Sequence, residues 1–141
     1  MMSPAFLACV ALVSSFYQLP PRVLPSIHAV EGGRPGMVSG NSNGSADLGV
    51  MQINTLWVPE LARHTRQPED IVRHRLTHDE CFGIAAAGAI LRIQLDREKG
   101  DLMRAIGNYH SRTPALNRAY GARVLRAAHR LYTPGGAHSQ R

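Results

Sequence analysis

The sequence predicts a mainly α-helical fold that is interrupted by one irregular segment. Apolar residues recur at helical spacing in several stretches, and residues 82–95 are apolar nearly all round, which is typical of a buried central helix. Between residues 33 and 49, by contrast, five glycines and two asparagines form a density of turn formers that no regular helix could absorb. We therefore expect a single globular helical domain over residues 5–132, containing a Gly- and Asn-rich loop.

The helices can be placed in order from their apolar spacing and their end signals. Prolines 20 and 21 end a first helix and suit the opening turn of a second, and Asp101 is placed to cap a helix that carries Leu102 to Gly107. A disordered tail is expected over residues 133–141. The predicted helices cover residues 5–17, 22–30, 56–64, 68–76, 82–95, 102–107 and 114–131.

Length and composition are those of an ordinary globular chain. The 141 residues are 44% hydrophobic and 18% charged, and no apolar run approaches the roughly 20 residues that a membrane span needs, so we expect no membrane span. The net charge of +6 comes almost entirely from arginine and favours an anionic partner, either nucleic acid or the cell envelope. No aromatic interleaving or helix-turn-helix pattern supports nucleic-acid readout, so no specific nucleic acid is expected.

Residues 28–54 hold the first cluster of chemically useful side chains. An apolar run over residues 23–30 ends on Glu31, with two glycines directly behind it. The negative pole of a helix dipole disfavours ionisation of a carboxyl at this end, which suits a group that must hold a proton. Downstream, Gln52 and Asn54 alternate with apolar residues, and amides bind sugars well because each offers both a donor and an acceptor. A carbohydrate ligand is therefore expected.

Four sequence blocks carry a family resemblance, and they occur in the family's order: residues 29–33 (AVEGG), 43–54 (NGSADLGVMQIN), 79–84 (DECFGI) and 105–110 (AIGNYH). Together they resemble a small lytic transglycosylase of the kind encoded beside type IV secretion, conjugation and pilus systems. The resemblance runs from about Cys9 to Tyr132 and implies a lysozyme-like α+β fold.

The resemblance also implies an activity and a set of site residues. It implies cleavage of the MurNAc–GlcNAc β-1,4 bond of peptidoglycan to give 1,6-anhydro-MurNAc, by a monomer that needs no cofactor and no metal. Glu31 would be the catalytic acid, whereas His110 stands where the family more often has asparagine. The substrate-binding residues implied are Gly49, Met51, Gln52, Asn54, Asn108, Tyr109 and Tyr120. Simple packing is the alternative for Tyr120.

Two cysteines, Cys9 and Cys81, are too few and too widely spaced for a zinc motif, which favours a single disulfide. In the family that it resembles, a cysteine of the first helix is joined to one in an Asp-Pro-Cys segment, and here Glu80 replaces that proline. The implied bond indicates an oxidising compartment, the periplasm or cell envelope. Residues 5–13 are apolar like a signal core, but no basic residue precedes Arg22. We favour a first helix that carries Cys9 over a cleaved export signal.

Two other functions compete with this interpretation. A hydrolytic muramidase would use Asp47 as the partner of Glu31, although the setting of Asp47 better fits an Asx turn or a helix cap, a structural role. A non-catalytic basic binding module would instead use the arginines of residues 114–131. His74 and His78 are four apart on a helix, but no third ligand at a sensible spacing supports a metal site.

Overall fold

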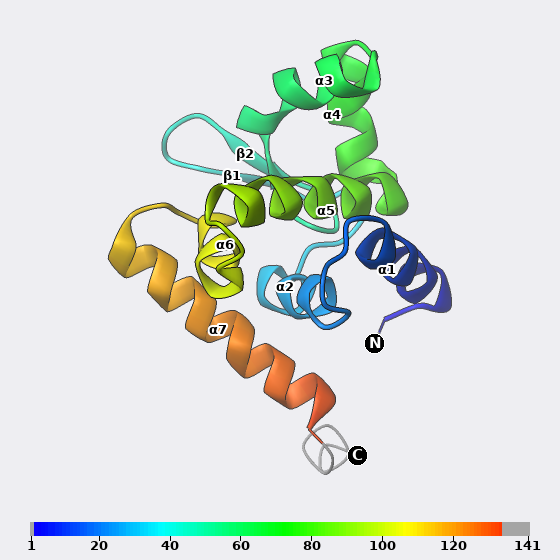
Figure 1. Cartoon of the computed structure of the whole chain (residues 1–141). Coiled ribbons are helices and arrows are strands. Elements are labelled where there is room, and N and C mark those ends of the chain that lie inside the picture. The colour runs from blue at the N-terminus through cyan, green and yellow to red at the C-terminus, as the bar shows by residue number, and fades with distance from the viewer. Residues whose placement is uncertain (1, 134–141) are drawn as a thin grey trace. The chain divides into compact units, whose positions relative to one another are not determined.

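The computed structural model describes residues 2–133, which are built mainly from α-helices (Figure 1). This part of the chain contains seven α-helices, one short 3-10 helix and three short strands. In chain order they are α1 Pro4–Phe16, α2 Val23–Glu31, β1 Val38–Gly40, β2 Ala46–Leu48, β3 Ile53–Asn54, η1 Thr55–Trp57, α3 Val58–Thr65, α4 Glu69–His78, α5 Glu80–Arg97, α6 Leu102–Asn108 and α7 Pro114–Tyr132. The prediction of a mainly α-helical fold is confirmed.

Each predicted helix forms, with its ends close to the positions that the sequence indicated. The cap at Asp101 is confirmed, because its carboxylate accepts a hydrogen bond of 3.1 Å from the backbone N–H of Arg104. The helix expected from residue 56 instead opens with the 3-10 turn η1, and Leu56 is 75% exposed rather than buried. The tail prediction concerns residues that lie almost wholly outside the described part of the chain.

The segment expected to be irregular contributes β1 and β2 to a three-stranded antiparallel sheet in the order β1-β2-β3. Its register pairs Ser39 with Asp47, and Asp47 with Asn54. The turn between β1 and β2 is an Asx turn, in which the side-chain oxygen of Asn43 accepts hydrogen bonds from the backbone N–H (3.0 Å) and the hydroxyl (2.6 Å) of Ser45. Strands of two or three residues are too short to show an alternating pattern, so the sequence did not reveal them.

The chain divides into two compact units. The described part of the first unit is residues 2–13 and 31–87, and that of the second is residues 14–30 and 88–133. The boundaries fall inside α1 and α5 and next to the last residue of α2, so three helices contribute residues to both units. The single domain over residues 5–132 stays a prediction.

The first unit combines the sheet with α3, α4 and the first half of α5. Its largest fully buried side chains include Met51, Ile53, Leu76 and Ile84, each at most 1% exposed. Burial of such a side chain stabilises a fold by about 1.5–3 kcal/mol. Apolar residues from the sheet segment and from the helices therefore share one core.

The second unit is organised around the packing of α6 on α7. Ala105 and Ile106 of α6 are buried, as are Val124 and Ala127 on one face of α7. Near the end of α7, the Arg22 guanidinium lies 5.2 Å from the centroid of the Tyr132 ring. Burial raises the pKa of the Tyr132 hydroxyl, and the nearby cation opposes that shift. No helix within residues 2–133 is both long and apolar enough to cross a membrane.

A disulfide joins Cys9 of α1 to Cys81 in the first turn of α5, as predicted. Both cysteines lie in the first unit, and their Cα atoms are 5.7 Å apart across a sequence separation of 72 residues. The expectation that a first helix carries Cys9 into a buried position is also confirmed, because its exposed fraction is 7%. The bond closes a long loop, and such a closure restricts the unfolded chain.

Loss of this bond should destabilise the protein strongly. The paired variant Cys9→Ala with Cys81→Ala should lower the free energy of unfolding by about 2–5 kcal/mol in urea titrations. The reduced wild-type chain, which keeps both sulfur atoms, should lose a similar amount and so controls for lost packing. A change below about 0.5 kcal/mol in the reduced protein would contradict a stabilising role for the bond.

Candidate functional site

Glu31 is the last residue of α2, as the sequence predicted. The next residue, Gly32, has a φ of +65°. This left-handed backbone conformation commonly ends helices, and residues other than glycine adopt it rarely. Glu31 is partly exposed to solvent, so a ligand in solution can reach this end of the helix.

Gly33 fixes the position of this helix end against the segment that begins at Gly49. A Cβ atom built on Gly33 would overlap the carbonyl oxygens of Gly49 and Val50, so only glycine fits without movement of the backbone. Gly33 is itself buried. The catalytic candidate Glu31 is therefore two residues from a close backbone contact with the predicted substrate-binding segment, although 18 or more positions separate the two in the sequence.

The turn that follows this contact is held by hydrogen bonds of its own. The N–H of Gly49 donates to the carbonyl of Met37 over 2.7 Å, and the Gln52 amide donates to the carbonyl of Gly49 over 2.9 Å. Gln52 has a φ of +53° and is 8% exposed, while the side chain of Met51 is fully buried. One amide hydrogen of Gln52 thus closes the turn, and its carbonyl oxygen and second hydrogen are the groups that could meet a ligand.

The side-chain amide of Asn54 makes its hydrogen bonds within the protein rather than leaving them for a sugar. Its amide nitrogen donates to the hydroxyl of Ser45 (3.1 Å) and to the carboxylate of Asp47 (3.0 Å). Its oxygen accepts a bond of 2.9 Å from the N–H of Leu56 and so caps η1. Both amide hydrogens and the oxygen are used, so Asn54 joins the sheet, its loop and η1.

The expectation that Asp47 forms an Asx turn or a helix cap is wrong. Asp47 lies within β2 in an extended conformation, and its carboxylate accepts from Asn54 on β3. The Asx turn is made by Asn43 and the cap by Asn54, because these asparagines stand at the turn and at the helix start. Asp47 is partly exposed, and its hydrogen bond to Asn54 still gives it a structural contact.

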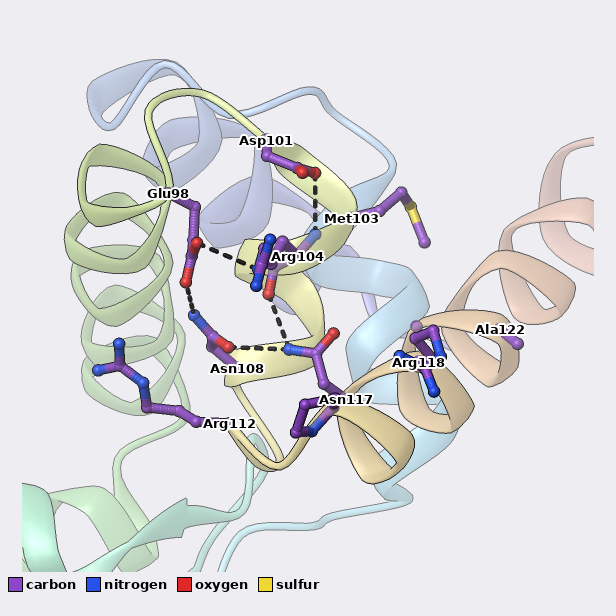
Figure 2. A pocket seen from close by; sticks show the side chains of 11 residues that line it. Glu98, Asp101, Met103, Arg104, Asn108, Arg112, Asn117, Arg118 and Ala122 are labelled. Carbon is purple, nitrogen blue, oxygen red and sulfur yellow. Dashed lines mark hydrogen bonds and ion pairs between the residues drawn. The ribbon is translucent and has the colours of Figure 1, made fainter.

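The second predicted cluster lies in the second unit and is a network of amides (Figure 2). The Asn108 amide nitrogen donates to the side-chain oxygens of Gln94 (3.1 Å) and Glu98 (2.6 Å), and its oxygen accepts from Asn117 (2.8 Å). A Cβ atom on Gly107 would overlap the Asn117 side chain, so this glycine makes room for the network. The predicted substrate ligand Asn108 therefore has both amide hydrogens bound within the protein.

Aromatic rings stack beside this network. The Tyr120 ring lies 5.1 Å from the His110 ring at an interplanar angle of 11° and 6.4 Å from the Tyr109 ring at 18°. Tyr120 is 2% exposed, which favours the packing alternative for its ring over a direct contact with sugar. Tyr109 is partly exposed, so it is the more accessible of the two tyrosines. The stack gives His110, which departs from the family pattern, a packing role.

A cavity of about 570 Å³ opens in the second unit between α6 and α7 (Figure 2). The sequence analysis predicted neither this cavity nor a role for Asn117. A signal for Asn117 was present, since it is a polar residue on the face of α7 that carries the buried residues 120, 121, 124 and 127. Eleven residues line the cavity: Glu98, Asp101, Met103, Arg104, Asn108, Arg112, Pro114, Asn117, Arg118, Gly121 and Ala122.

Metal-ligand geometry is not found within residues 2–133, where no group of three or more His, Cys, Asp or Glu side chains could hold an ion. His74 and His78 lie with their ring centroids 4.6 Å apart, on α4. Their arrangement is a tilted ring contact between neighbouring helical turns.

Comparison with known proteins does not assign the chain to a family. A scan against protein-family models matches none of them, and a search of curated proteins returns no match. The resemblance to lytic transglycosylases therefore rests on the sequence blocks themselves.

The contact at Gly33 makes a sharp prediction. Gly33→Ala should lower the free energy of unfolding by about 2–3 kcal/mol, because its methyl group must displace backbone atoms of Gly49 and Val50. Gly40→Ala is the matched control, since nothing lies within 4 Å of a Cβ built there, and it should change stability by less than about 1 kcal/mol. Equal effects of the two substitutions in urea titrations would show that the contact at Gly33 is not tight.

Proposed function

We propose that this protein is a peptidoglycan lytic transglycosylase that cleaves the MurNAc–GlcNAc β-1,4 bond and leaves a 1,6-anhydro-MurNAc end. The observation that carries the proposal is the contact of Gly33 with the backbone of Gly49 and Val50. It joins the two sequence blocks of the resemblance that contain an acid and amide donors, so the chain two residues after Glu31 meets the start of the turn that carries Gln52.

Glu31 would act first as an acid and then as a base. Its protonated carboxyl donates to the glycosidic oxygen as the bond from that oxygen to C1 of MurNAc breaks. The carboxylate then takes the proton of the C6 hydroxyl of the same sugar as the oxygen of that hydroxyl bonds to C1. No water is consumed, and the carboxyl ends in the protonated form in which it began. Proton transfer of this kind typically contributes about 100- to 10,000-fold to a rate.

Ordinary glycosidases use a second carboxylate, either as the nucleophile or as the base that activates a water. In the proposed reaction neither is needed, because the 2-acetamido group of MurNAc stabilises the cationic sugar centre and the C6 hydroxyl attacks it. The amide of Gln52 and the backbone near Met51 would hold this sugar. Position matters greatly here, since a displacement of about 1 Å can cost about 100-fold in rate.

The setting that we propose is the periplasm or cell envelope, where the enzyme would open the wall locally for a secretion, conjugation or pilus apparatus. The Cys9–Cys81 disulfide fits an oxidising compartment. The net charge of +6 suits a negatively charged envelope.

Glu31→Gln tests the proposal. The substitution keeps the shape of the side chain but removes its proton, so release of soluble fragments from purified sacculi should fall by about 100-fold or more. Glu69→Gln is the matched control, because Glu69 lies in the exposed first turn of α4, and it should cleave normally. Circular dichroism should show both variants folded. Equal turnover by the Glu31 variant and the wild type would refute the assignment. If the wild-type protein does not cleave sacculi but binds DNA in a salt-sensitive way, it is the basic binding module.

A hydrolytic muramidase is the second candidate, because Asp47 is a partly exposed acid on β2 and does not cap a helix. We expect Asp47→Asn to keep its hydrogen bond with Asn54 and to cleave within about tenfold of the wild-type rate, since loss of a catalytic base costs about 100-fold or more. A loss as large as that of the Glu31 variant, at an unchanged Tm, would identify Asp47 as catalytic.

A further inference from the structure

We infer that the cavity between α6 and α7 binds a short anionic peptide, and specifically the stem peptide of peptidoglycan. The inference rests on the proposed function for the choice of peptide but not for the existence of the site. Every residue that lines the cavity belongs to the second unit, and α6 packs directly on α7. We call this cavity the α6–α7 groove.

The acids at the α6–α7 groove are already satisfied by the protein. Glu98 accepts from the Asn108 amide over 2.6 Å and pairs with the Nε of Arg104 over 3.4 Å, and its side chain is only 17% exposed. Asp101 accepts from the backbone N–H of Arg104 as the cap of α6. Neither carboxylate is therefore arranged to neutralise a further cation.

The arginines at the α6–α7 groove are in the opposite situation. Arg112 and Arg118 are exposed, and neither has an ion pair or side-chain hydrogen bond within the described part of the chain. Figure 2 shows them on either side of Asn117. Arg104 uses its Nε for Glu98, which leaves its two terminal nitrogens for a ligand. Guanidinium groups bind carboxylates through paired hydrogen bonds, so the groove offers separate positions for carboxylates.

The remaining lining is small or apolar and limits what can enter. Met103, Pro114, Gly121 and Ala122 supply surfaces that suit methyl groups rather than large side chains. The volume of about 570 Å³ is within the range of sites for small ligands. Stem peptides combine alanine methyl groups with the carboxylates of dicarboxylic residues, so their chemistry matches both the arginines and the apolar lining.

The test is a titration of the full chain with a free stem tetrapeptide, followed by calorimetry or amide chemical shifts at low salt. We expect saturable binding that weakens about tenfold in Arg112→Gln and about tenfold in Arg118→Gln. Arg123→Gln is the matched control, because Arg123 is exposed on the same helix but does not line the groove, and it should bind within about twofold of wild type.

Three outcomes would overturn the inference: no saturable binding, equal weakening in Arg123→Gln, or equal affinity for an all-L peptide of alanine and glutamate. The last outcome would show a site for acidic protein segments instead of peptidoglycan stems. A stem peptide with amidated carboxylates should lose binding if the arginines recognise charge. Because the peptide carries no glycan, the Glu31→Gln variant should bind it like wild type. Failure of the groove and failure of the proposed cleavage can therefore be told apart.

Discussion

The close approach of Gly33 to the backbone of Gly49 and Val50 is the constraint on which the candidate site depends. It sets where α2 ends, because Glu31 and Gly32 must deliver the chain to that contact. It also sets the start of the Gly49–Gln52 turn against Gly33, two residues beyond the end of α2. In the proposed reaction a catalytic carboxyl gains rate only when it is held in place, and the backbone contact two residues after Glu31 would serve that purpose without using a side chain.

Amide side chains carry much of the remaining architecture. Asn54 joins β2, its loop and η1, while Asn108 and Asn117 connect α5, α6 and α7 through Gln94, Glu98 and backbone carbonyls. Buried amides that satisfy both donors and acceptors make a packing arrangement specific, because any shift would leave a polar group without a partner. Asn54 and Asn108, which the sequence blocks predicted to bind the substrate, thus use their amides to hold the protein backbone in place.

The sequence predicted α5 well because residues 82–95 are apolar over several turns, and it predicted α6 from the cap at Asp101. It also located Glu31 at a helix end. It did not show the strands, which have two or three residues each, nor the partners of Asp47 and Asn54, which depend on strand register. The α6–α7 groove was missed because only the tertiary packing of α6 on α7 shows that Arg112 and Arg118 line a cavity.

The most direct measurement of the proposed chemistry is mass spectrometry of the fragments that the wild-type protein releases from purified sacculi. A single acid that works on the sugar's own C6 hydroxyl leaves 1,6-anhydro-MurNAc ends, whose mass is lower by one water than that of reducing ends. We expect anhydro ends in nearly all released fragments. A preponderance of reducing MurNAc ends would show that water is the acceptor, and would contradict a lytic transglycosylase mechanism centred on Glu31.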